Sequence, residues 1–112
     1  MTSSNVAVLA AMVSVNDDSL SVDLSDGRSI TVPIAWFPRL AHGSQAERAK
    51  WRLIGKGSGI HWPDLDEDIS VESLLAGRMS EESAESLEHW LEDRKHGKSR
   101  RRRAGAGANL PR

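Results

Sequence analysis

The side chains best suited to metal or acid–base chemistry lie in one short stretch of the chain. His61 is followed by an acidic run that contains Asp64, Asp66, Glu67 and Asp68. Carboxylate and imidazole groups bind metals, and histidine is the most frequent general base. The run lacks the spacing and central glycine of a calcium loop, and no partner nucleophile for His61 is evident. We therefore expect no catalytic residue, no metal and no cofactor.

The segment Gly55-Lys56-Gly57-Ser58-Gly59 is the second candidate, because glycine-rich loops can bind phosphate. A Walker loop needs four residues between its first glycine and Gly-Lys-Ser/Thr, and a long helix must follow. Neither condition is met here. Glycines also serve tight turns and close backbone contacts. We interpret the segment as a flexible turn.

Four tryptophans are a large share for a chain of 112 residues. Burial is the usual fate of this side chain, and we expect three of the four to be buried. Tryptophan is also enriched at the centres of protein interfaces. We choose Trp36 or Trp51, which lie near predicted loops, as an exposed anchor for a partner.

The net charge of −1 conceals a separation along the chain. The residues up to Asp93 contain all 16 acidic side chains and seven basic ones, which gives −9, and the residues from Arg94 onward carry +8. The basic end includes a run that could pair with nucleic-acid phosphates without reading sequence: Arg100, Arg101, Arg102 and Arg103. The alternatives are an acidic protein partner or a solubilising tail that rests on the acidic body.

Strands are predicted over residues 6–34, where apolar and polar residues alternate with a period of two. Asp26-Gly27 lies between the second and third runs and predicts a hairpin with a tight primed turn. Residues 53–54 and 60–62 are expected to form an irregular strand pair around the glycine turn. Residues 64–68 are interpreted as an acidic loop, whose charges either cap the next helix or face a partner.

Short helices are predicted from serine caps. Ser44-Gln45-Ala46-Glu47 matches a capping box, so we expect a helix from Gln45 to about Trp51. Ser70 should cap a helix that Gly77 stops, and Ser80 should cap a final helix that ends near Gly97. A stripe on that final helix is apolar: Ala84, Leu87, Trp90 and Leu91.

These elements predict an α+β fold: an antiparallel meander of three to four strands with small helices on one face. Residues 1–97 form one domain in this prediction, and residues 98–112 form a disordered arginine-rich tail. The chain has no cysteine, and the apolar run near its start is too short for a signal peptide or a membrane span. We expect a cytoplasmic protein.

One stretch of the chain resembles a known bacterial family. Ile60-His61-Trp62-Pro63, followed by Leu65-Asp66-Glu67-Asp68-Ile69, carries the match, and the Asp26-Gly27-Arg28 hairpin agrees with it. The resemblance is to the domain-of-unknown-function 2442 family and covers about residues 10–77. It implies a small α+β protein with an antitoxin-like or regulatory binding role. It implies no catalytic residues, and His61, Trp62 and Pro63 would mainly be a fold signature.

Three functional interpretations result. The first is a non-catalytic protein-binding module, antitoxin-like, that uses Trp36, Trp51, Asp66, Glu67 and Asp68 to mask a basic surface of a toxin-like protein. The second is a nucleic-acid accessory or transcription regulator that uses the arginine tail. The third is a metal-dependent enzyme around His61 and Asp66. A homodimer formed through edge strands is a further alternative.

Overall fold

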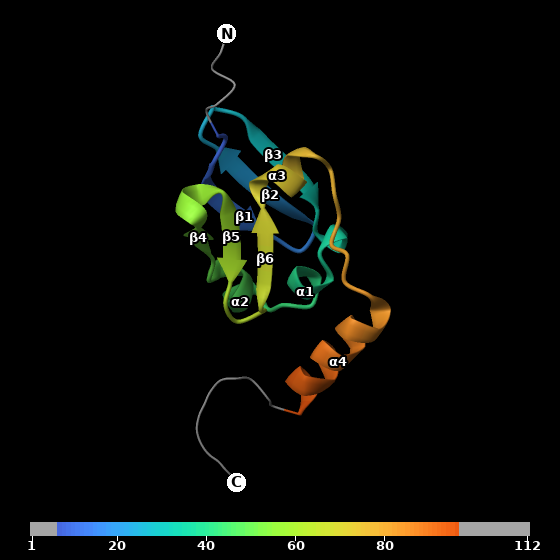
Figure 1. The fold of residues 1–112 in the computed structure, drawn as a ribbon. Helices are drawn as coiled ribbons and strands as arrows, with labels where there is room; N and C mark the ends of the chain where they lie inside the picture. The colour runs from blue at the N-terminus through green and yellow to red at the C-terminus, as the bar shows by residue number, and fades with distance from the viewer. Residues whose placement is uncertain (1–6, 97–112) are drawn as a thin grey trace. The chain divides into compact units, whose positions relative to one another are not determined.

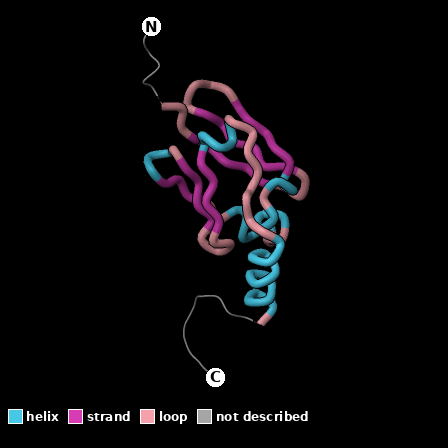
Figure 2. The backbone as a smooth tube through the Cα atoms, turned by 45° about the vertical axis from the view of Figure 1, so that its right-hand side comes forward, coloured by secondary structure: helices cyan, strands magenta, loops and turns pink. Residues whose placement is uncertain are grey.

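Six strands form two antiparallel sheets in a computed structural model, which describes residues 7–96. Sheet A consists of β1 (Ala10–Val15), β2 (Ser19–Leu24) and β3 (Ser29–Pro33), and sheet B of β4 (Arg52–Ile54), β5 (Gly59–Trp62) and β6 (Glu67–Ser70). Figures 1 and 2 show the two sheets as two layers. The predicted α+β fold with an antiparallel meander is confirmed. The predicted tail, including Arg100–Arg103, lies outside the described residues.

Sheet A follows the alternation of its sequence. Leu20, Val22 and Leu24 are buried, and Leu20 pairs with Val32 across the hairpin. The turn differs from the prediction. Gly27 has a φ of +93°, but Asp26 does not share the positive φ that a primed turn needs at both positions. The Leu24 N–H donates to the Arg28 carbonyl at 2.8 Å, so the hairpin closes over the three residues 25–27 and not over two; the Gly27 N–H donates to the Leu24 carbonyl at 3.1 Å within this loop.

Strand β1 contains a bulge. Ala10 lies opposite Leu24 and Met12 lies opposite Asp23, which leaves Ala11 as an extra residue. Ala11 and Met12 therefore both point outward, whereas Val13 returns to the core. A bulge breaks the strand alternation at one residue and increases the local twist. It explains why Met12 is 55% exposed although it lies in a largely apolar run.

Three short helical segments follow sheet A: η2 (Ile34–Trp36), α1 (Pro38–Ala41) and α2 (Gln45–Ala49). The predicted capping box at the start of α2 is confirmed. The Glu47 N–H donates to the Ser44 hydroxyl at 3.1 Å, and the Ser44 N–H donates to the Glu47 carboxylate at 2.9 Å. The helix ends at Ala49, slightly before the predicted end near Trp51.

Two helices follow sheet B. The helix α3 (Val71–Leu75) begins at the predicted cap, since Ser70 accepts from the Ser73 N–H at 3.1 Å. The helix α4 (Ala84–Lys95) begins later than predicted, because its cap is Ser83 and not Ser80. The Ser80 N–H instead donates to the Trp36 carbonyl at 2.9 Å, which ties Ser80 to η2.

The chain divides into two compact units between Ser80 and Glu81, and each is described by itself. The second unit contains α4, which buries no residue. In that helix the Arg94 guanidinium lies 4.7 Å from the centre of the Trp90 ring, a cation–π contact along one helix face. No helix in residues 7–96 has the length and apolar character needed to cross a membrane.

Arg48 is the one charged residue buried in the core of the described chain. Its guanidinium donates to the carbonyls of Leu40 and Ala41 at 2.8 and 2.9 Å and to the Asp17 carboxylate at 2.7 Å. The Trp62 indole N–H in turn donates to the Arg48 carbonyl at 3.1 Å. Arg48 thus ties the end of α1, the β1–β2 turn and strand β5 together.

Candidate protein-binding site at strand β6

The acidic run forms part of a β-hairpin and is not a loop throughout. The Leu65 N–H donates to the Trp62 carbonyl at 3.2 Å, which closes a turn with Pro63 at its second position. Proline presets the φ angle that this position needs. Asp66 completes the turn with a φ of +52°, and β6 begins at Glu67. The loop predicted over 64–68 therefore ends at Asp66.

His61 and Asp68 lie directly opposite each other on β5 and β6. The His61 Nδ1 atom hydrogen-bonds to the Asp68 carboxylate. Their side chains lie on the face of sheet B that points away from Ile60 and Trp62, both of which are completely buried. The contact gives the His61 ring a polar partner within the fold. One alternative for the acidic run is wrong, because Ser70 caps α3 and none of Asp66, Glu67 and Asp68 does.

Asp66 is held by an arginine from α1. The Arg39 guanidinium donates to the Asp66 carbonyl at 3.0 Å and lies 3.4 Å from its carboxylate. The Asp66 side chain nevertheless remains 85% exposed, and that of Asp68 67% exposed. Arg39 and His61 therefore fix the positions of two carboxylates that still face the solvent.

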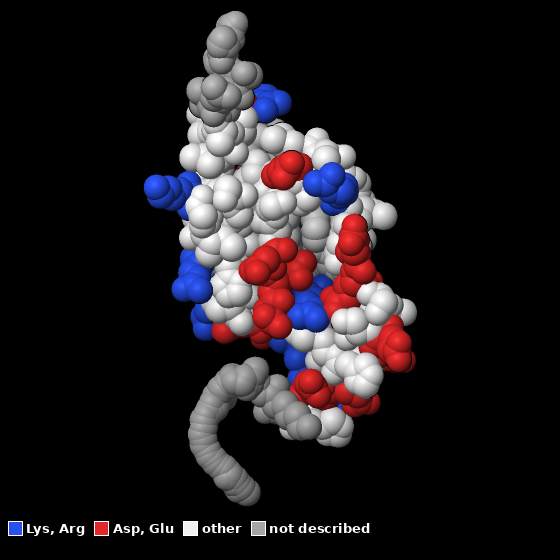
Figure 3. Space-filling model, in the orientation of Figure 1, with Lys and Arg blue, Asp and Glu red and all other residues white. Residues whose placement is uncertain are grey.

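The charge around this hairpin is mostly negative. Figure 3 shows acidic side chains over the part of the surface where β6 lies in Figure 1. Asp64 at the turn lies 3.4 Å from the Lys50 ammonium, a partly exposed pair of small energetic effect. Within residues 7–96, no group of three histidine, aspartate or glutamate side chains is arranged to hold a metal ion.

The tryptophans are less buried than expected. Trp62 is completely buried, whereas Trp36, Trp51 and Trp90 are only half-buried, so the expectation of three buried tryptophans is wrong. Trp36 ends η2 and Trp51 immediately precedes β4. In residues 7–96, neither indole hydrogen-bonds to the acidic side chains of the hairpin. The structure therefore does not join the predicted aromatic and acidic residues into one bonded cluster.

The glycine-rich segment, predicted to be a flexible turn, forms one short 3₁₀ turn, η3 (Gly55–Gly57). Gly55, Lys56 and Gly57 have φ angles of +56°, +59° and +102°, and they connect β4 to β5. A Cβ atom on Gly57 would come within 3.1 Å of the Ala10 carbonyl, so the backbone packs closely against the start of β1. The glycine at this position serves a close backbone approach.

Two residues of this region were not predicted from the sequence. Arg39 holds the turn at Asp66, and Arg48 supports the hairpin through Trp62. Both are separated from their partners by more than a dozen residues, and nothing in their local sequence distinguishes them from surface arginines. The strand β6 did have a signal, since Ile69 and Val71 alternate with Asp68 and Ser70.

Comparisons with known proteins identify a family and its fold. A family described as "Protein of unknown function (DUF2442)" matches residues 10–80. A crystal structure of a protein of unknown function from Rhodospirillum rubrum is 27% identical, with a TM-score of 0.60 over 67% of this chain and 93% of that one. A solution NMR structure of an uncharacterized Chromobacterium violaceum protein, 18% identical, shares the fold with a TM-score of 0.57 over 72% and 74% of the two chains. No curated protein sequence matches.

Proposed function

The chain belongs to the domain-of-unknown-function 2442 family, and on this premise we propose that it is a non-catalytic protein-binding module. The matched region ends at residue 80, where the first compact unit also ends. The family region therefore coincides with the unit that contains both sheets and the β5–β6 hairpin. The proposed binding site lies within this unit.

The observation that supports this proposal best is the fixed but exposed pair of carboxylates on the hairpin. Side chains that are already positioned lose little conformational entropy on binding, which favours affinity. Asp66 is held by Arg39, and Asp68 is held by His61, yet both remain largely accessible. Exposed negative charge steers the approach of a positively charged partner and selects against acidic ones. The partner that fits is a basic protein surface.

The finer form of the proposal is antitoxin-like. In this form the partner is a small toxin-like protein whose basic surface the module masks, and the setting is the cytoplasm. Trp36 and Trp51, each half-buried, would contribute apolar anchors to the same interface. Because they lie on other elements than the hairpin, their contribution to binding can be tested separately from that of the acidic residues.

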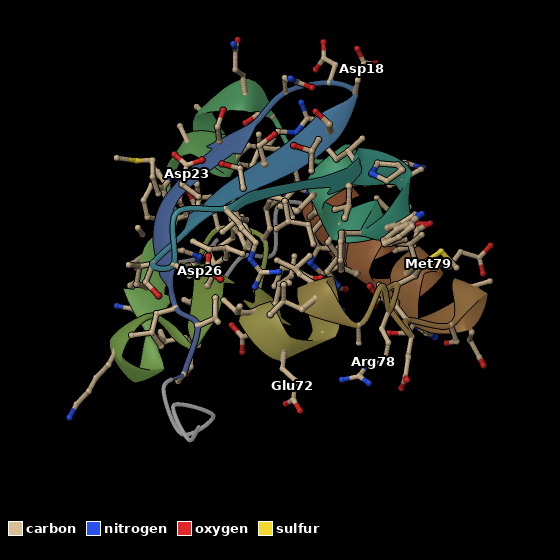
Figure 4. The ribbon with its side chains drawn as sticks, turned by 90° about the horizontal axis from the view of Figure 1, so that it is seen from above. Asp18, Asp23, Asp26, Glu72, Arg78 and Met79 are labelled. Atoms are coloured by element: carbon tan, nitrogen blue, oxygen red, sulfur yellow. The ribbon has the colours of Figure 1, made fainter. Side chains whose placement is uncertain are left out.

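The proposal can be tested by coexpressing the chain with the product of the neighbouring gene and quantifying the complex by affinity capture. The Asp66→Lys and Asp68→Lys variants should lose most of the complex while their melting temperatures stay close to that of the natural chain. Asp18→Lys is the matched control. Figure 4 shows Asp18 pointing away from the body of the fold at the β1–β2 turn.

Two results would contradict the acidic site. The first is an unchanged complex in both hairpin variants, and the second is an equal loss in Asp18→Lys. The nucleic-acid alternative has its own arm: the four-fold variant R100Q/R101Q/R102Q/R103Q should weaken salt-sensitive retention on DNA or RNA only if the tail binds phosphates. If the protein complex still forms with this variant, the four arginines are not needed for binding of the protein partner.

A further inference from the structure

Strand β6 is the outermost strand of sheet B and can hydrogen-bond to a further strand. We infer that the partner binds as an extended, basic segment that adds a fourth strand alongside β6. This inference rests on the proposed function and specifies its mode of binding. Strand addition is a common way to recognise peptides, since main-chain hydrogen bonds give affinity and alternate side chains give selectivity.

The pairing of β5 with β6 determines which main-chain groups face outward. The Val71 N–H donates to the Ser58 carbonyl at 2.9 Å, which continues the ladder beyond the last paired residues. In an antiparallel ladder, hydrogen-bonded pairs alternate with pairs that are not bonded to each other. His61 and Asp68 form one of the pairs whose main-chain groups are not hydrogen-bonded to each other, although their side chains are. The N–H and carbonyl of Asp68, and the N–H of Ser70, therefore point away from β5.

The open part of this edge is short and has defined ends. The Asp66 carbonyl accepts from Arg39 at one end. The Ser70 carbonyl accepts from the Ser73 hydroxyl at 2.9 Å at the other end, where α3 begins. Within the described part of the chain, no hydrogen bond reaches the outward groups of Asp68. A segment of three to four residues in β conformation would fit between these ends.

The other sheet edges are less suited to adding a strand. β1 is interrupted by its bulge, β3 ends in Pro33, and β4 has three residues. Bulges, prolines and short strands are the usual means by which proteins block their edges. β6 is also short, with four residues, but it has neither a bulge nor a proline, and it carries Asp68 beside its open groups. A partner residue opposite Asp68 would project on the same sheet face, so lysine or arginine is favoured there.

Synthetic peptides of the type Thr-Lys-Val-Lys-Val-Thr provide a probe with no assumption about the natural partner. Two N-methylated versions carry the same charge but block alternate main-chain N–H groups. Titration of the full chain by NMR should show that one version binds and the other loses about tenfold or more in affinity. Hydrogen exchange at the Asp68 and Ser70 amides should slow on binding, because both become hydrogen-bonded.

Two variants test the same point from the side of the protein. Asp68→Ala removes the carboxylate and should weaken binding about two- to fivefold, as expected for an exposed ion pair. Asp68→Pro also removes the outward N–H and should weaken peptide binding by a further factor of about ten. Proline is tolerated at an edge position whose N–H does not serve the ladder, and the melting temperature checks the fold.

Each outcome decides between the proposals. Equal binding of both methylated peptides, or equal effects of the two Asp68 variants, would overturn strand addition and leave the acidic binding site standing. Failure of every basic peptide to bind would overturn both. Binding that appears only in the R100Q/R101Q/R102Q/R103Q variant would identify the chain's own arginine segment as the occupant and overturn an external partner.

Discussion

Arg48 is the side chain whose removal we expect to destabilise the fold most. It is only 8% exposed, and it donates to the carbonyls of Leu40 and Ala41 at 2.8 and 2.9 Å. The Arg48→Ala variant removes both of these charge-assisted hydrogen bonds, each worth about 1.5–3 kcal/mol, although the Leu40 carbonyl still accepts from the Gly43 N–H at 3.1 Å. With the lost packing of the aliphatic stem, we expect the free energy of unfolding to fall by about 3–5 kcal/mol.

Urea unfolding, followed by tryptophan fluorescence to which the buried Trp62 contributes, measures this loss as a shift of the midpoint at constant slope. The matched control is Asp17→Asn, because the Asp17 side chain is 94% exposed and its ion pair contributes at most about 1 kcal/mol. Arg48→Lys keeps the charge but lacks the planar guanidinium group, so its loss in the free energy of unfolding should lie between those of Arg48→Ala and Asp17→Asn. An Arg48→Ala loss of less than about 1 kcal/mol, or an equal loss in Asp17→Asn, would refute the reasoning.

Three further predictions concern local structure. Gly27→Ala should lower the free energy of unfolding by about 1–2 kcal/mol from its positive φ alone, since no atom lies within 4 Å of the added Cβ, and Gly27→Asn should cost less in the same urea assay. Ser44→Ala should cost about 1 kcal/mol by removing the cap of α2, an effect that a neutral Gln45→Ala control should not reproduce. The Arg28 N–H and guanidinium lower the pKa of Asp26 below its ordinary value. The ionised carboxylate therefore stabilises the fold above the pKa of the unfolded chain, and this stabilisation is lost as the pH falls through the pKa of the folded chain. In thermal melts, Asp26→Asn should flatten this decline of the melting temperature on the acid side.

Elements defined by nearby residues were predictable from the sequence. Strands β2 and β3 follow the period of two, and the capping box of α2 depends on residues only three positions apart. Details of the turns were less predictable. Asp26-Gly27 fits both a two-residue primed turn and a three-residue loop, because glycine supplies a positive φ in each case. The register of the flanking strands decides between them.

Features that depend on distant residues could not be predicted. The sequence predicts a loop here because the first two residues of β6, Glu67 and Asp68, are acidic, as are Asp64 and Asp66 in the preceding turn. The formation of β6 depends on pairing with β5 and on burial of Ile69. In the candidate site, the sequence identified the acidic residues and His61, but it did not identify the arginine that holds Asp66 in place. Arg39 and Asp66 are 27 residues apart, and only the folded chain brings them together.

The consecutive pairing of strands in both sheets has a consequence for how the chain folds. β1, β2 and β3 pair in chain order, as do β4, β5 and β6, so each meander closes over short loops with small entropic cost. Chains dominated by such local pairings fold faster than those with distant ones. The bonds from Arg48 to Asp17 and from Trp62 to Arg48 span 31 and 14 residues and join the first meander to the second. Contacts between the two meanders, completed by one buried arginine, close longer loops and therefore carry a larger entropic cost than the pairings within each meander.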